Sequence, residues 1–118
     1  MDHVDNVHDR RWTDDDTPGA KGYAYMEIVA REPEYTSAYS CELVRLGPGD
    51  ESMTHHEPYN HLLFFVEGGG EITIGDTTWP LGPGSYAKVK AGETHSLRNL
   101  GDTEMQLLTV YDPPRVRD

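Results

Sequence analysis

Four residues of this chain have types and spacing suited to binding a metal ion. His55, Glu57 and His61 lie within seven positions of one another, directly before an apolar run, and His95 stands farther along the chain. Three imidazole nitrogens and one carboxylate are a ligand set for a divalent transition metal such as Fe, Mn, Ni, Zn or Cu. The sequence therefore predicts a metal site if the fold brings these four side chains together.

Strand geometry indicates how these side chains would converge. Side chains on a strand alternate between its two faces, so His55 and Glu57 would share one face, about 7 Å apart, while His56 points to the other. After a short turn, His61 opens the next strand, and His95 begins a further one. We expect side chains from three adjacent strands to meet at one point inside a barrel.

The elements that must position these residues are short strands. From Tyr23 onward, runs rich in Tyr, Val, Ile, Thr and Phe alternate with residues that favour turns. This pattern predicts an all-β fold, a sandwich or barrel of about eight to ten antiparallel strands with almost no helix. The turn signals are Gly47-Pro48-Gly49, Gly68-Gly69-Gly70, Gly75-Asp76, Gly82-Pro83-Gly84, Ala91-Gly92 and Gly101-Asp102.

The same pattern divides the chain into two parts. Residues 1–20 are polar and carry too few apolar groups to offset the entropy of ordering them, so we expect an N-terminal arm. Residues 21–118 are long enough for one folded domain with a hydrophobic core. Within it, the continuous apolar run at residues 62–66 predicts core packing, because such a run in a two-sheet fold is mostly buried.

Composition and charge exclude several classes of partner. The 118 residues include 21 acidic and 10 basic side chains, for a formal net charge of −11. A nucleic acid or an anionic membrane surface would require clustered cations, so neither is expected as a partner. The chain has no apolar stretch of signal-peptide or membrane-span length, and we expect a cytoplasmic protein.

The spacing of glycines and ligand candidates resembles two motifs of the cupin superfamily. The first motif is similar to the series Gly49, His55, Glu57, His61 and Gly68, whose members are separated by five, one, three and six residues. The second motif is similar to the series Gly84, Lys90, Gly92, His95 and Asn99, whose members are separated by five, one, two and three residues. The resemblance covers roughly residues 40–110. It implies a double-stranded β-helix, or jelly-roll barrel, with a metal in its mouth held by three His and one Glu.

Two positions depart from the usual cupin pattern. The first motif of the family usually places a second histidine before the glutamate, whereas this chain has Glu57 first and His61 after it. The set still contains three nitrogens and one oxygen, but the carboxylate occupies a different corner of the coordination sphere. Lys90 replaces a proline and would alter a turn, not a ligand. A particular substrate therefore does not follow from the resemblance.

Two classes of function are compatible with such a site. The first is a metal-dependent enzyme acting on a small oxygen-bearing substrate, either a dioxygenase or a non-redox isomerase, cyclase or lyase. In that case Glu57 could also move protons, as could the hydroxyls of Tyr39, Tyr59 and Tyr86, and Arg45 or Arg98 would hold a substrate carboxylate. The alternative is a non-catalytic cupin module that senses a ligand or a metal. The intact ligand set favours the enzyme.

We also expect a homodimer. Sheets in so small a barrel leave an exposed edge and an apolar outer face, and a second copy of the chain would cover them.

Overall fold

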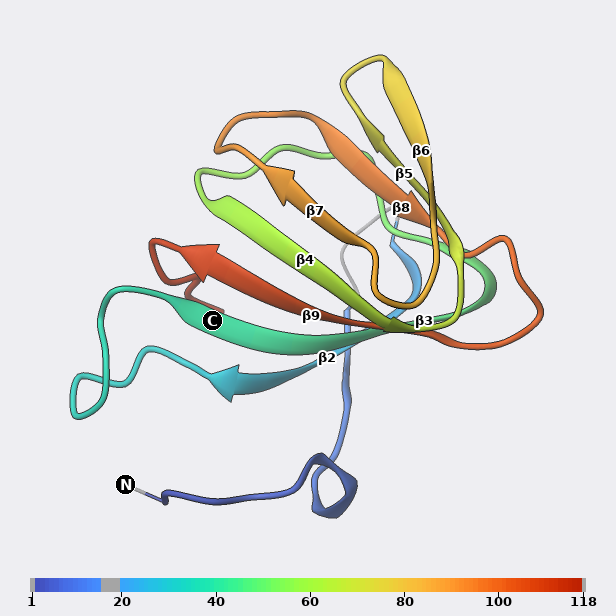
Figure 1. The fold of residues 1–118 in the computed structure, drawn as a ribbon. Helices are drawn as coiled ribbons and strands as arrows, with labels where there is room; N and C mark the ends of the chain where they lie inside the picture. The colour runs from blue at the N-terminus through green and yellow to red at the C-terminus, as the bar shows by residue number, and fades with distance from the viewer. Residues whose placement is uncertain (1, 16–19, 118) are drawn as a thin grey trace.

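The computed structural model describes residues 2–15 and 20–117, and most of this part of the chain forms antiparallel strands (Figure 1). The helical element found there is a short 3-10 turn, η1 (Val7–Asp9). The all-β, jelly-roll fold predicted from the sequence is confirmed. The strands are β1 (Thr13–Asp14), β2 (Lys21–Val29), β3 (Ser40–Glu51), β4 (Asn60–Glu67), β5 (Gly70–Ile74), β6 (Thr77–Leu81), β7 (Tyr86–Val89), β8 (His95–Arg98) and β9 (Met105–Asp112).

Strand β3 links the two halves of the barrel. The strands follow the order β6-β5-β8-β3-β9-β4-β7, with β2 added alongside β3. The first part of β3 pairs with β9 from Ser40 to Leu46, whereas its last residue, Glu51, pairs with β8. Between the two parts, Gly49 adopts a φ of +74°, which a residue with a side chain rarely does. The strand therefore passes from one half to the other, and the sheet curls around the core (Figure 1).

The hydrophobic core fills the space between the two halves. Along β4 and β9 buried and exposed positions alternate with a period of two, as expected for strands that have one face toward a core. The core side chains come from both halves of the barrel. They are Val44, Leu46, Leu63, Phe65, Ile72, Val89, Leu97, Met105 and Leu107.

The prediction that the whole run at residues 62–66 lies in the core is wrong. Leu63 and Phe65 are buried, but Leu62, Phe64 and Val66 are 43%, 45% and 52% exposed. The reason is that β4 belongs to an antiparallel sheet with only one covered face, so alternate side chains point outward whatever their type. The run therefore contributes an apolar outer surface as well as core.

The N-terminal residues that the structure describes contact the barrel at a few points. Thr13 pairs with Tyr25 in a two-residue ladder between β1 and β2. The Arg45 guanidinium lies 4.6 Å from the centre of the Trp12 ring. The boundary between arm and domain at residue 20 stays a prediction. Among the described residues, no helix combines the length and the apolar character that crossing a membrane requires.

Asn99 ties the connection between β8 and β9 to strand β3, at the end of β8 opposite His95. Its side chain is fully buried, and the amide nitrogen Nδ2 lies 2.9 to 3.0 Å from the carbonyl oxygens of Leu46, Gly47 and Thr103. Its Oδ1 accepts a hydrogen bond from the Gly101 amide at 3.0 Å. Removing this one side chain would leave several buried backbone groups without a partner.

We expect Asn99→Ala to lower the free energy of unfolding by about 3 kcal/mol or more, because each buried polar group left unpaired costs about 1 to 3 kcal/mol. Chemical denaturation measures this change. The matched control is Asn60→Ala, since the exposed Asn60 accepts one hydrogen bond, from the Ala91 amide at 2.9 Å. That control should lose about 1 kcal/mol or less. Equal losses in the two variants would contradict the structural role of Asn99.

Candidate metal centre

The connection between β3 and β4, residues 52–59, crosses the mouth of the barrel and is pinned to β8. His55 and His95 form an isolated antiparallel bridge and exchange two backbone hydrogen bonds, at 3.1 and 2.9 Å. The Ser52 amide donates to the Leu97 carbonyl at 2.9 Å, and the Ser52 hydroxyl accepts from the Leu97 amide at 2.8 Å. These contacts hold two segments that are distant in sequence side by side.

The expectation that His55 and Glu57 lie on a regular strand is not met. Strand β3 ends at Glu51 and β4 begins at Asn60, so the intervening residues run between the two halves of the barrel. Among the described residues of this connection, only His55 has a β-bridge partner, which is His95. His55 and Glu57 nevertheless turn the same way, and their side chains meet. His56 lies between them and is exposed.

The other two histidines come from regular strands. His61 is the second residue of β4, and its strand neighbours are Val89 and Tyr111. His95 is the first residue of β8. Both histidines are buried, each about 5% exposed. The His95 ring centre lies 4.6 Å from that of His55 and 4.9 Å from that of His61, so the three rings surround one point.

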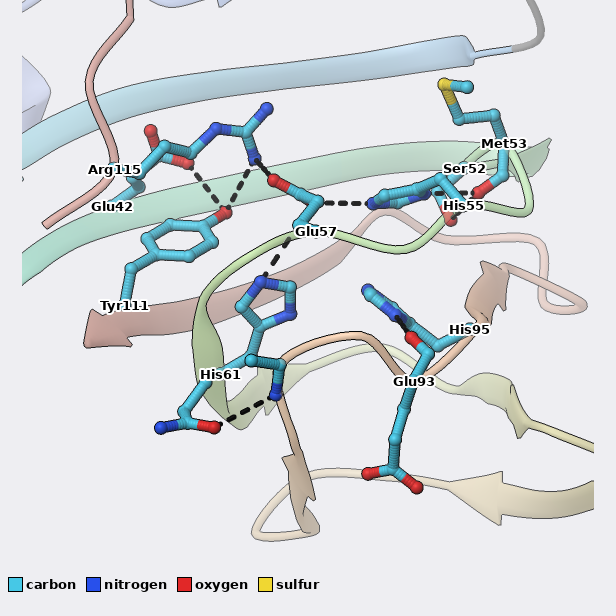
Figure 2. Close-up of polar contacts among 12 residues, drawn as sticks. Glu42, Ser52, Met53, His55, Glu57, His61, Glu93, His95, Tyr111 and Arg115 are labelled. Atoms are coloured by element: carbon cyan, nitrogen blue, oxygen red, sulfur yellow. Dashed lines mark hydrogen bonds and ion pairs between the residues drawn. The ribbon is translucent and has the colours of Figure 1, made fainter. Parts of the chain in front are cut away.

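Glu57 lies among these rings (Figure 2). Its Oε1 is 2.6 Å from Nε2 of His55 and 3.9 Å from Nε2 of His61. The ligand atoms of His55, Glu57 and His95 all lie within 4.8 Å of one another, so these three residues could hold one metal ion. The structure thus places three of the four predicted ligands within reach of one ion, and His61 lies next to them without belonging to that group.

Backbone carbonyls orient two of the rings. Nδ1 of His55 lies 2.7 Å from the carbonyl oxygen of Met53, and Nδ1 of His95 lies 3.0 Å from that of Glu93. These contacts place an N–H on Nδ1 of each ring, so that Nε2 faces the cluster, and the 2.6 Å contact with Glu57 requires a second N–H on Nε2 of His55. Metal-binding histidines in proteins commonly have this arrangement, in which the second nitrogen donates to a carbonyl and fixes the ring.

His61 carries a nitrogen that the surrounding protein leaves unused. Among the described residues, its Nε2 is the buried side-chain atom without a hydrogen-bond partner. Burial lowers the pKa of His61 to about 4, so its ring is neutral at pH 7. Burial likewise lowers the pKa of His95. A buried ring nitrogen without a partner is costly, and in its unprotonated form it would be satisfied by a metal ion. The donor set therefore fits a divalent transition metal.

Glu57 is held in its ionised form. Burial alone would raise its pKa, but the hydrogen bond from His55 and the charge of Arg115 outweigh burial and bring the pKa to about 2. Nη1 of Arg115 lies 3.0 Å from Oε2 of Glu57. The hydrogen bond between His55 and Glu57 raises the pKa of His55, against the effect of burial. A negative charge is thereby fixed beside three imidazoles, as a cation site requires.

The cavity at this cluster is small. Its volume is about 30 Å³, which is room for an ion and about one water molecule, not for an organic molecule. Leu63, Leu97 and Leu107 form its apolar lining, and Tyr23 and Tyr111 also line it. Burial raises the pKa of both tyrosines, so their hydroxyls stay protonated at neutral pH.

The three tyrosines considered from the sequence lie differently. Tyr86 is exposed at the start of β7. The Tyr59 ring stacks 6.4 Å from the His61 ring, next to the cluster. Tyr39 lies in the β2–β3 loop, where its hydroxyl is 3.1 Å from that of Tyr35, and it is outside the cavity lining that the structure describes. Tyr23 and Tyr111 reach the cavity in their place. Both occupy alternate, inward positions of strands, and parity was the signal that could have found them.

The arginines considered from the sequence pair with surface carboxylates. Arg45 lies 3.8 Å from Glu104, and Arg98 lies 3.5 Å from Glu51. The arginine that contacts the cluster is Arg115, near the end of the chain. It lies outside both motifs, and nothing in its local sequence indicated that the C-terminal segment returns to the mouth of the barrel.

Comparisons with known proteins identify the family and the fold of this chain. A family model described as "Cupin domain" matches residues 42–111. L-ectoine synthase from Aliivibrio fischeri is 36% identical over 77 residues, which are 64% of this chain and 60% of that protein. The oxalate-binding protein of Thermotoga maritima is 27% identical over 94 residues, 78% of each chain. The chain thus matches only about 60% of the length of the ectoine synthases.

Solved structures share the fold at low sequence identity. The polyketide cyclase RemF from Streptomyces resistomycificus superposes with a TM-score of 0.86 at 19% identity, over 99% of this chain and 83% of the other. KdgF from Halomonas sp. superposes with a TM-score of 0.81 at 16% identity, over 98% and 96% of the two chains. At this level of identity the likeness extends to the fold alone.

Proposed function

This chain belongs to the cupin superfamily, and from that premise we propose that it is a metal-dependent enzyme. Its substrate would be a small organic molecule that binds the metal through oxygen atoms. Its reaction would be non-oxidative: a cyclisation, an isomerisation or an elimination. His55, Glu57, His61 and His95 would hold the metal.

The observation that carries the proposal is the unpartnered Nε2 of His61. It lies in a buried site 3.9 Å from a carboxylate oxygen, beside two further imidazoles whose Nε2 atoms face the same point. Two neutral imidazoles, those of His61 and His95, buried beside an ionised carboxylate have no evident packing role. When bound there, a divalent transition metal supplies a Lewis acid that polarises a substrate oxygen.

The residues of the chain would divide the remaining work. A carboxylate with a pKa of about 2 is a weak base at neutral pH, so we assign Glu57 the role of ligand and not of proton acceptor. The protonated hydroxyl of Tyr23, which lines the cavity, can donate a hydrogen bond to an oxygen that gains negative charge, whereas the Tyr111 hydroxyl already donates to Glu42. Tyr59, next to His61, stays a candidate for contact with the substrate.

The comparisons support non-oxidative chemistry by analogy. Several relatives are named L-ectoine synthase, and one structural neighbour is named a polyketide cyclase. These names refer to a synthesis and a ring closure, not to a reaction with oxygen. Because one fold hosts many chemistries, this analogy only ranks the reaction classes. Turnover experiments must decide between them.

We expect His61→Ala to lose metal severely, because one bond of four to the ion is removed and its binding free energy is lost. The measurement is the zinc content after reconstitution with one equivalent and gel filtration. His56→Ala is the matched control and should retain zinc, since the His56 side chain is exposed and lies outside the cluster. Glu57→Gln should retain zinc only in part, because the amide keeps an oxygen donor but loses the charge.

The opposite pattern would contradict the ligand assignment. If His56→Ala lost the metal while His61→Ala kept it, the ion would bind at another point of the mouth and the proposed centre would be wrong.

For the reaction, we expect zinc-loaded protein to convert at least one member of a panel of 2-keto and 3-hydroxy acids at equal rates in air and under nitrogen. Proton NMR follows the products, and an oxygen electrode measures consumption of O₂. His61→Ala carried through the same assay controls for contaminating activity. A product that forms only in air, with O₂ consumed, would replace this proposal by a dioxygenase. If a member of the panel bound to the zinc-loaded protein without any turnover, the non-catalytic cupin module that senses a ligand would be favoured.

The outer face of β4 provides a basis for the homodimer. Phe64 is 45% exposed and pairs with Tyr86 of β7 and Leu108 of β9, and Leu62 pairs with Val110. These side chains share one outward face across three strands, and we call them the outer apolar patch. Single exposed apolar residues are common, but contiguous ones mark an interface. We propose that a second copy of the chain covers this patch.

We expect Phe64→Glu to convert the protein from dimer to monomer, because a buried charge without a partner would face its own copy across the two-fold axis. Light scattering coupled to gel filtration gives the mass. The control is Tyr35→Glu, which adds the same charge at a residue that is 54% exposed and lies in the β2–β3 loop. A wild-type protein that is monomeric at micromolar concentration would refute the dimer.

A further inference from the structure

A second, larger cavity lies between strands β6 and β7, at the open edge of the barrel. These strands stand at opposite ends of the strand order β6-β5-β8-β3-β9-β4-β7 (Figure 1). The volume of the cavity is about 420 Å³, within the range of about 300 to 1,000 Å³ that small-molecule sites in proteins have. We call it the seam cavity. Its lining includes Ile72, Ile74, Trp79, Leu81, Ala87 and Lys88.

Trp79 lines this cavity although it belongs to the inner face of the barrel. Its ladder partner on β5 is Ile72, so the two side chains share one face of the β5–β6 hairpin. Ile72 is 1% exposed and belongs to the core, whereas Trp79 is 46% exposed. The reason is that β6 is an edge strand, and no ladder in the described part of the chain closes it against β7. A large aromatic ring is thereby left open to a ligand on the inner side of the sheet.

The seam cavity is distinct from the cavity at the metal centre, although the two are neighbours. No described residue lines both of them. Ladder pairs place the two linings side by side: Ile72 next to Leu97, Ile74 next to His95, and Ala87 next to Leu63. A molecule in the seam cavity can therefore bind without any bond to a metal ion.

The charge of the lining indicates which apolar molecules fit. Lys88 is the one charged residue among the described residues of the lining, in a chain with a net charge of −11. Within residues 2–15 and 20–117, no carboxylate forms an ion pair with Lys88. An aromatic molecule with an anionic group would find an indole for its ring and a cation for its charge.

We propose that the seam cavity binds a small aromatic acid, with the ring against Trp79 and the carboxylate toward Lys88. The remaining lining is apolar, as small-molecule sites usually are, and one cation sets the orientation. This inference goes beyond the proposed function, because it assigns a ligand to a different cavity and does not require a metal.

A second copy of the chain is the competing occupant. Tyr86 belongs both to the outer apolar patch and to the lining of the seam cavity. A copy seated on that patch would approach from the outer face of β7, whereas Trp79 shares the inner face of the hairpin with the buried Ile72. The dimer and the ligand therefore use different faces of the sheet.

The test is an NMR titration of ¹⁵N-labelled protein with 2-naphthoate, without zinc and with one equivalent of zinc. The chain has two tryptophans, and Trp79→Phe assigns their indole N–H signals by removing one of them. We expect 2-naphthoate to shift the Trp79 signal with the same affinity in both samples. The Trp12 signal should stay in place, because Trp12 lies against Arg45 and outside the cavity.

Variants measured by isothermal titration calorimetry separate the ring from the charge. Trp79→Leu should weaken 2-naphthoate binding about tenfold, because the aromatic partner is lost. Lys88→Met should weaken 2-naphthoate binding about threefold to fivefold, as expected for one exposed ion pair, and should leave the neutral 2-naphthamide unaffected. Lys90→Met is the matched control and should bind both as wild type does, since Lys90 lies outside the cavity lining.

Three results would overturn the inference. The first is a Trp79 signal that 2-naphthoate does not shift. The second is Lys88→Met binding 2-naphthoate as tightly as wild type. The third is a shift seen only in Phe64→Glu, because a second copy of the chain would then fill the cavity in the wild type.

Failure of the metal centre has a different signature. His61→Ala should bind 2-naphthoate as wild type does, whether or not it retains zinc. A Trp79 shift that required both zinc and His61 would overturn the independent site and assign the ligand to the metal centre.

Discussion

Two backbone hydrogen bonds between His55 and His95 hold the β3–β4 connection against the start of β8. The cluster of His55, Glu57, His61 and His95 depends on this bridge. The bridge joins the β3–β4 connection, which is not a regular strand, to the regular strand β8. His55 and Glu57 reach the histidines of β4 and β8 only while the connection stays there. The curvature of β3, which pairs with β9 at one end and with β8 at the other, brings the two segments within reach.

Electrostatic pairing explains how so many ionisable groups can be buried at one end of a small acidic barrel. Glu57 lies between His55 and Arg115, and the buried Glu42 is paired with Arg117. Removing one partner of such a pair leaves an uncompensated charge in a dry site, which costs several kcal/mol, about 3 to 5. The C-terminal segment is therefore part of the site's structure, although it lies outside the region that matches the cupin family model.

The sequence was sufficient for the fold and for the membership of the cluster, for identifiable physical reasons. Glycine-rich turns and alternation reveal strands locally, and the spacing of His55, Glu57 and His61 is a short-range pattern. Parity placed His55 and Glu57 on one side correctly, although a regular strand does not carry them. The same alternation explains why Phe64 faces outward, because its neighbours Leu63 and Phe65 on β4 are buried. The position of Arg115 depends on long-range contacts that no local pattern encodes.

The central claim is that the side chains of His55, Glu57, His61 and His95 bind one divalent metal together. X-ray absorption spectroscopy of the protein loaded with one equivalent of zinc tests it most directly, because it counts the ligands and identifies imidazoles by their outer-shell scattering. The account predicts one shell of nitrogen and oxygen donors at about 2.0 to 2.2 Å with three imidazoles. A spectrum with one imidazole or none, or a spectrum unchanged in His61→Ala, would contradict it.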